Sequence, residues 1–375
     1  MQTGWLQPVV DAPGPYASVH VDVTRTDQAA GEELRLRWAA VRSSLSDAGA
    51  PADLVGELEE RVLAPTGLPG EQARSLVATE KGVLLDRVLP RRPLRDSGTW
   101  GPVPHLMPVV RALAGTLPYA LVEVDHAGGD ITLVDAVGRP LEQQEVEGGH
   151  DVLHKYGGGG WSHRRFQMRV EDSWERNATA VAERLDAVLA EHAPQLVLLA
   201  GDPAARTYVR RHASGRVADR LVDVEGGGRS EGVHAEAFAE RVEEALARHR
   251  QTQMGEVLAR FTQERGRDGA AAGGLAAVVD ALRAGAVDVL LLHDDPSSTA
   301  RLWAGDSPLH LGTTEDEVRA LGSTTATQDR ADAVLLRALV AQKGDVELVE
   351  GEDVLPDGIG ALLRFDVRPP VPGRT

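Results

Sequence analysis

Short apolar runs alternate with long amphipathic segments along this chain, most clearly between residues 119 and 200. Residues 119–125 and 131–135 are two β-rich runs on either side of a glycine-containing turn, which predicts a hairpin. In residues 166–192 the apolar positions recur at spacings of three and four, which predicts a long helix with one buried face. Residues 196–200 then predict a short buried strand. Such alternation of strand, helix and strand indicates a layered α/β domain.

The order of these signals along the chain predicts three domains and a mixed α/β (α+β) fold class. We expect an N-terminal α/β domain at residues 1–112, a middle domain at 116–252 and a C-terminal α/β domain at 253–375. With 375 residues, of which 42% are hydrophobic, the chain is long enough to bury a separate core in each domain.

The rest of the chain shows the same mixture of elements. Strands are expected at residues 16–23, 84–89, 287–292, 346–349 and 359–365. Helices are expected at residues 29–48, 51–63, 236–250, 254–263, 275–284 and 331–343, with Gly285 as a left-handed cap of the fifth. The proline-rich stretch 90–108 is expected to be irregular or edge structure, the glycine-rich stretches 226–229 and 269–274 to be loops, and Asp294-Asp295 to be a strand-end turn.

Composition excludes several kinds of site and location. Because the chain has no cysteine, it holds neither a disulfide nor a thiolate metal site. No run approaches eighteen consecutive apolar residues, and the N-terminus lacks the basic start and apolar run of a secretory signal. We therefore expect a cytoplasmic location and no membrane partner. The formal net charge of -17 argues against general nucleic-acid binding.

One basic island interrupts this acidic chain. Residues 152–170 contain lysine and arginine but no aspartate or glutamate, and they coincide with the most glycine-rich stretch. Glycines let a backbone approach RNA closely, an indole can stack on a base, and arginines can contact phosphate. The candidate RNA-binding residues are Lys155, Gly157, Gly158, Gly159, Gly160, Trp161, Ser162, His163, Arg164, Arg165 and Arg169.

Simpler structural roles stand beside this interpretation. The glycines also suit a flexible linker, Trp161 also suits a cap over apolar neighbours, and the arginines also suit a salt-bridged helix start beside Glu171 and Asp172. Ser162 and His163 do not form a convincing nucleophile pair, because neighbouring side chains seldom align for proton transfer and no third orienting group is apparent. We therefore expect no catalytic residue, no metal and no cofactor.

Three stretches, in this order, resemble the class-1 peptide release factors of eukaryotes and archaea. Residues 119–135 resemble the strands that open the family's middle domain. Residues 154–166 resemble its catalytic loop, in which Gly-Gly-Gln is followed by Ser, two variable residues, Arg and Phe. Residues 275–292 and 358–365 resemble its C-terminal domain, which recruits a translational GTPase. The matching loop positions are Gly159, Gly160, Ser162, Arg165 and Phe166.

The chain departs from the family at the position most important for its chemistry. In the family, the glutamine of Gly-Gly-Gln helps to place the water that attacks the peptidyl-tRNA ester, and the matching residue here is Trp161. An indole offers one N–H donor and no acceptor, so it cannot reproduce a carboxamide. Because placing the water is a large part of a hydrolytic rate, we expect peptide release to be lost or severely weakened.

The resemblance implies a three-domain, release-factor-like architecture whose middle domain projects the loop at residues 157–165 toward the peptidyl-transferase centre. Bacterial members of the superfamily include the Balon-type hibernation factors, which occupy the ribosomal A site and act with the elongation factor EF-Tu. The resemblance therefore implies a stress-response factor that regulates translation by binding the ribosomal RNA of the 70S ribosome. Such a factor would inactivate or protect the ribosome, and its C-terminal domain would meet EF-Tu or a similar GTPase.

Two other functions stay open on the sequence. One is a ribosome rescue or release factor that still cleaves peptidyl-tRNA or tRNA, which would need His163 or Gln167 to replace the missing glutamine. The other is a non-ribosomal α/β protein that kept the fold for contacts with other proteins. Its affinity for ribosomes would be absent or independent of salt, because RNA contacts weaken steeply as salt rises.

Overall fold

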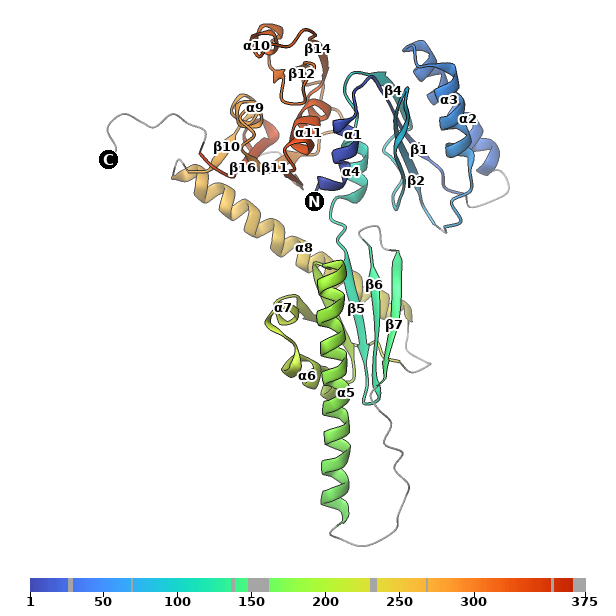
Figure 1. The fold of residues 1–375 in the computed structure, drawn as a ribbon, viewed down its shortest axis with the longest axis vertical. Helices are drawn as coiled ribbons and strands as arrows, with labels where there is room; N and C mark the ends of the chain where they lie inside the picture. The colour runs from blue at the N-terminus through green and yellow to red at the C-terminus, as the bar shows by residue number, and fades with distance from the viewer. Residues whose placement is uncertain are drawn as a thin grey trace. The chain divides into compact units, whose positions relative to one another are not determined.

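The chain forms two compact units in the computed structural model. The first unit combines Met1–Ala114 with Met254–Thr375, and the second is Gly115–Gln253. Figure 1 labels the helices and strands, and both units contain sheets and helices, so the expected mixed α/β class is confirmed. The structure describes residues 1–25, 30–68, 70–135, 139–147, 162–229, 235–267, 269–351 and 354–366.

The N-terminal segment of the first unit builds an antiparallel sheet in the order β3-β2-β1-β4. Helices α2 and α3 cover one face of it, where Leu34 and Trp38 of α2 and Leu58 of α3 join Val19 of β1 and Leu76 of β2 in one buried cluster (Figure 1). The elements are η1 (Gly4–Leu6), α1 (Gln7–Asp11), β1 (Tyr16–Asp22), α2 (Ala30–Asp47), α3 (Ala52–Leu63), β2 (Ala73–Thr79), β3 (Gly82–Leu89), β4 (Ser97–Gly101) and α4 (Met107–Leu113).

The C-terminal segment of this unit contains a sheet in the order β10-β16-β11-β15 and a small sheet in the order β13-β12-β14. Helix α11 is buried along almost its whole length. The predicted cap at Gly285 is confirmed, since its φ is +68° and Ala286 N–H donates to the Ala281 carbonyl at 3.0 Å. The elements are β10 (Ala271–Gly273), α9 (Leu275–Arg283), β11 (Val287–His293), β12 (Arg301–Ala304), β13 (Leu311–Gly312), α10 (Glu315–Ala320), β14 (Thr327–Arg330), α11 (Ala331–Ala341), β15 (Asp345–Val349), η2 (Pro356–Gly358) and β16 (Ile359–Leu363).

Polar contacts join the two segments of the first unit. The Thr3 hydroxyl is fully buried and donates to the Gly344 carbonyl at 2.5 Å. The Arg111 guanidinium donates two hydrogen bonds to the Asp294 carboxylate, at 2.7 and 2.6 Å. Charge-assisted pairs with two parallel bonds fix geometry as well as adding energy. These contacts help to make one unit from segments that the middle of the chain separates.

The second unit is a sheet in the order β7-β6-β5-β8-β9 with helices on both faces. The predicted hairpin of β5 and β6 is confirmed, and β5 pairs in parallel with β8. In β8, Val197 and Leu199 pack with α5, whereas Leu196, Leu198 and Ala200 pack in a cluster with α8. The elements are β5 (Tyr119–Val124), β6 (Gly128–Val134), β7 (Pro140–Glu147), α5 (Ser162–His192), β8 (Leu196–Gly201), α6 (Pro203–His212), α7 (Gly215–Ala218), β9 (Leu221–Asp223) and α8 (Ala235–Gly266), of which the residues from Met254 onward belong to the first unit.

Two local expectations are wrong. Residues 236–250 and 254–263 belong to one continuous helix, α8, because residues 251–253 (Gln-Thr-Gln) contain neither proline nor glycine to interrupt it. The stretch 269–274 is also more than a loop, since β10 lies within it and pairs with β16. Among the residues that the structure describes, no helix is both long and apolar enough to span a membrane.

Candidate functional site

Helix α5 is much longer than the sheet on which it packs. Its 31 residues correspond to about 46 Å, whereas the six to eight residues of β5 to β8 correspond to about 20–27 Å. Among its residues from Ser173 onward, the buried ones run from Asn177 to Leu189. The N-terminal half of the helix therefore extends beyond the strands (Figure 1). This extension carries the C-terminal part of the basic island.

A set of contacts anchors α5 where it leaves the sheet. The Trp174 ring stacks on the His126 ring, with 3.7 Å between centroids and 16° between planes. One turn further along, the buried Asn177 amide donates to the His126 carbonyl at 2.8 Å. His126 lies in the turn between β5 and β6, and its Nε2 is 3.5 Å from a carboxylate oxygen of Asp202. These contacts tie the helix to the hairpin and so orient its projecting half.

The turn after β8 packs so tightly that it requires glycine. Gly201 has a φ of +103°, and a Cβ on it would lie 2.1 Å from the Val124 carbonyl oxygen. The next residue, Asp202, accepts hydrogen bonds from the backbone N–H groups of Ala204 and Ala205 at 2.8 and 3.0 Å, and thereby caps α6. Because Asp202 also lies beside His126, this turn adjoins the contacts that anchor α5.

Arg229 holds the glycine-rich turn at residues 226–228 against the sheet. Its side chain is only 13% exposed and lies 3.3 Å from Asp125 and 3.2 Å from Asp130, and it also contacts Glu145. Burial disfavours the charged guanidinium, but hydrogen bonds and charges of Asp130 and Asp125 outweigh burial and raise the pKa of Arg229. This turn was expected to be a surface loop, and the structure gives it an ion-paired anchor.

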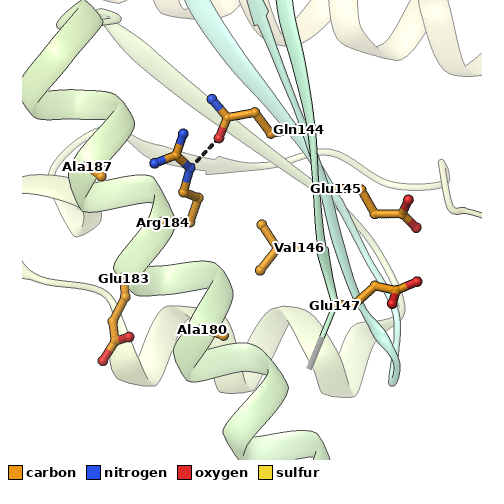
Figure 2. A pocket seen from close by; sticks show the side chains of 8 residues that line it. All are labelled: Gln144, Glu145, Val146, Glu147, Ala180, Glu183, Arg184 and Ala187. Atoms are coloured by element: carbon orange, nitrogen blue, oxygen red, sulfur yellow. Dashed lines mark hydrogen bonds between the residues drawn. The ribbon is translucent and has the colours of Figure 1, made fainter. Parts of the chain in front are cut away.

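A shallow cavity of about 670 Å³ lies between β7 and α5. Figure 2 shows that Arg184 reaches toward Gln144 there, and the Arg184 Nε donates a hydrogen bond to the amide oxygen. Because its glutamates outnumber its single arginine, the cavity would repel phosphate, and we do not include it in an RNA-binding site. Its lining residues are Gln144, Glu145, Val146, Glu147, Ala180, Glu183, Arg184 and Ala187.

The predicted site residues fall into two groups. Ser162, His163, Arg164, Arg165 and Arg169 lie within α5, of which the structure describes the backbone at these positions. The expectation that residues 162–165 belong to the loop is therefore wrong, because they form the first turn of the helix. Outside the described residues lie Lys155, Gly157, Gly158, Gly159, Gly160 and Trp161.

The described residues form no metal site. Within the described ranges, no group of three or more histidines, aspartates and glutamates is placed to hold an ion. The expected strand-end turn at Asp294-Asp295 is confirmed, since Asp295 accepts the backbone N–H of Ser297 at 2.9 Å while Asp294 pairs with Arg111. Sequence reasoning missed the anchor formed by His126, and its one signal was Trp174 on the buried face predicted for the long helix.

Known proteins resemble both the second unit, which we also call the middle unit, and the whole chain. The sequence model of bacterial archaeo-eukaryotic release factor family 2 matches residues 118–267. Uncharacterized protein Rv2629 of Mycobacterium tuberculosis (strain ATCC 25618 / H37Rv) is 29% identical over 368 residues, which cover 97% of each chain. Uncharacterized protein MT2704 of the strain CDC 1551 / Oshkosh matches equally, with 29% identity and the same coverage.

Solved structures of translation factors resemble the chain more distantly. The archaeal translation termination factor aRF1 is 15% identical, with a TM-score of 0.24, and the match covers 94% of this chain and 93% of that one. Dom34 of Saccharomyces cerevisiae, a translation termination-like factor, is 13% identical, with a TM-score of 0.40 and 81% of each chain covered.

Proposed function

We propose, from the match of residues 118–267 to the bacterial archaeo-eukaryotic release factor family 2, that this chain occupies the ribosomal A site without hydrolysing peptidyl-tRNA. Bound there, it inactivates or protects the 70S ribosome in the cytoplasm. The basic island at residues 152–170 reaches the ribosomal RNA of the peptidyl-transferase centre. Residues 253–375 meet EF-Tu or a similar translational GTPase, which assists delivery.

The observation that carries the proposal is the projecting half of α5. A helix about twice as long as its supporting strands, fixed at its base by His126, Trp174 and Asn177, is suited to carry a loop into a narrow site. The first turns of that helix carry Arg164, Arg165 and Arg169, the arginines of the basic island. Rigid elements hold a binding group more accurately than loops do, so a helix can fix the position of the basic residues at its tip.

The charge distribution of the chain also favours contact with ribosomal RNA through the tip of α5. The whole chain has a formal net charge of -17, so ribosomal RNA repels most of its surface. The basic island, with Lys155, Arg164, Arg165 and Arg169 and no carboxylate, is the part of the sequence best suited to phosphate. The protein therefore approaches RNA with the tip of its middle unit first.

Trp161 determines whether the bound protein is an enzyme, and a release assay tests its role. Ribosomes carrying labelled peptidyl-tRNA in the P site are mixed with wild type or with Trp161→Gln, which restores Gly-Gly-Gln. We expect no release above background from wild type. We expect release from the variant to be at least about 100-fold faster, because one well-placed polar group contributes on the order of 10²–10³ to such rates.

The same assay includes His163→Ala and Gln167→Ala as the alternatives to the missing glutamine. Peptide release by wild type that either substitution abolishes would make the protein a rescue or release factor and overturn the proposal. Binding of Trp161→Gln to the ribosome without any release would also count against it, because the loop would then not occupy the position of the family's catalytic loop.

A further inference from the structure

A cavity lined by six arginines lies within the first unit. It has a volume of about 780 Å³, within the range of roughly 300–1,000 Å³ typical of small-molecule sites. Its wall comes from the loop before β4, from α4, from the segment before β12 and from β14. The cavity therefore exists only where the N-terminal and C-terminal segments of this unit pack together.

Three arginine side chains at this cavity form no hydrogen bond and no close ion pair within the part of the chain that the structure describes. None of the side chains of Arg91, Arg95 and Arg301, which all line the cavity, makes a hydrogen bond or an ion pair within 4 Å among the described residues. Arg301 does act on Asp329 at longer range, where its charge helps to lower the pKa of that carboxyl. An unpaired guanidinium is a strong donor for phosphate or carboxylate oxygens, because its planar fork matches their geometry. Three of them around one hollow, on a chain with a net charge of -17, indicate an anionic ligand.

The other charged groups of the wall have partners of their own. Arg330 lies 2.7 Å from Asp332, and the His105 Nε2 lies 3.0 Å from Asp329. Arg111 is paired with Asp294, and Arg92 is shared between Asp22 and Glu71 at 3.5 and 3.3 Å. Both lining carboxylates, those of Asp329 and Asp332, thus already have partners, and the six lining arginines outnumber them.

The floor of the cavity is held rigidly by a neutral histidine. His20 is 1% exposed, and burial lowers its pKa to about 4, so that it carries no charge near neutral pH. A neutral imidazole has one N–H, which Nε2 must donate to the His105 carbonyl at 2.8 Å, and Nδ1 then accepts from the Ser75 hydroxyl at 2.8 Å. This bond fixes the backbone of His105, whose side chain reaches Asp329.

The rest of the wall is apolar. Met107, Pro108, Ala112 and Pro296 line the hollow beside the arginines. A ligand that satisfies both surfaces has a phosphate group at one end and a flat, weakly polar portion at the other. We propose that this cavity binds a nucleoside polyphosphate, with its phosphates on Arg91, Arg95 and Arg301 and its base against the wall of Met107, Pro108 and Pro296.

Calorimetric titration of the full chain with ATP and with GTP tests the proposal. We expect one binding site per chain for at least one of the two nucleotides, and an affinity at least tenfold lower in the double variant Arg95→Glu, Arg301→Glu. Pyrophosphate should bind more weakly than the nucleotide and adenosine or guanosine should bind more weakly still, because each contacts only one of the two surfaces. The ligand should also raise the melting temperature of wild type, since it joins two segments of one unit.

Arg35→Glu is the matched control. Arg35 is exposed on α2, lines no part of the cavity and, like the cavity arginines, has no partner within the described residues, so this change should leave the affinity unaltered. Thermal melts without ligand verify that the double variant is folded. The proposal is overturned if no nucleotide binds at millimolar concentration, if Arg35→Glu weakens binding as much as the double variant does, or if single-stranded RNA binds there and mononucleotides do not. Each of these results is independent of whether the protein binds ribosomes.

Discussion

Replacing Arg164, Arg165 and Arg169 together by alanine is expected to lower the affinity for 70S ribosomes and to flatten its dependence on salt. Each phosphate contact contributes about 0.7–0.9 to the slope of log affinity against log salt concentration, so losing three reduces the slope by about 2–3. A fourfold rise in salt, from about 50 to 200 mM, would then weaken the wild type roughly 20–40-fold more than the variant. Binding titrations at several potassium chloride concentrations measure the two slopes.

A matched control removes the same charge from helices α6 and α7 of the same unit. Arg210, Arg211 and Arg216 are exposed on α6 and α7, and replacing them by alanine should leave the slope within about one unit of wild type. An equal loss of slope in both triple variants would show that binding responds only to total charge. A wild-type slope near zero would favour a non-ribosomal role.

Leu185→Ala is expected to destabilise the middle unit by about 2–5 kcal/mol, which is the usual cost of the cavity left by a buried leucine. Leu185 is fully buried in α5 and belongs to the cluster that contains Val122, Ile131 and Leu199 of the sheet. Urea unfolding followed by tryptophan fluorescence measures the loss, with Trp174 reporting from the same helix.

Glu183→Ala controls for the loss of side-chain atoms from α5, because Glu183 is exposed two residues earlier in the helix. Its effect should stay within about 0.5 kcal/mol. If Leu185→Ala also costs less than that, α5 does not depend on this core and cannot serve as a firm support for the basic island. Ribosome binding by Leu185→Ala should fall only by the fraction of protein that is unfolded.

Local patterns predicted the elements that carry their own periodicity. The β5–β6 hairpin and the long helix α5 each show a buried face in the sequence, and both are confirmed. Strand β7 (Pro140–Glu147) was not predicted, because most of its side chains are exposed and its sequence is largely polar. β7 is an edge strand that is held by backbone hydrogen bonds to β6. Backbone hydrogen bonds do not depend on side-chain type, so they produce no recognisable pattern in a polar sequence.

Non-local contacts explain what the sequence could not predict about the sites. His126 and Trp174 lie far apart in the chain, and only the packing of α5 against the hairpin turn brings their rings together. Arg95 and Arg301 likewise meet at one cavity only because the two ends of the chain share a unit. By contrast, the coincidence of arginines with a glycine-rich stretch is a local pattern, which the sequence shows directly, and its role in ribosome binding stays a prediction.

Co-sedimentation of the purified protein with vacant 70S ribosomes tests the central claim most directly. Wild type is compared with a variant in which Gly159, Gly160 and Trp161 are replaced by alanine. Our account predicts that wild type pellets with the ribosomes and that the variant does so much less, since the loop is the anchor. If neither protein pellets, with or without EF-Tu, the claim that this chain acts on the ribosome is contradicted.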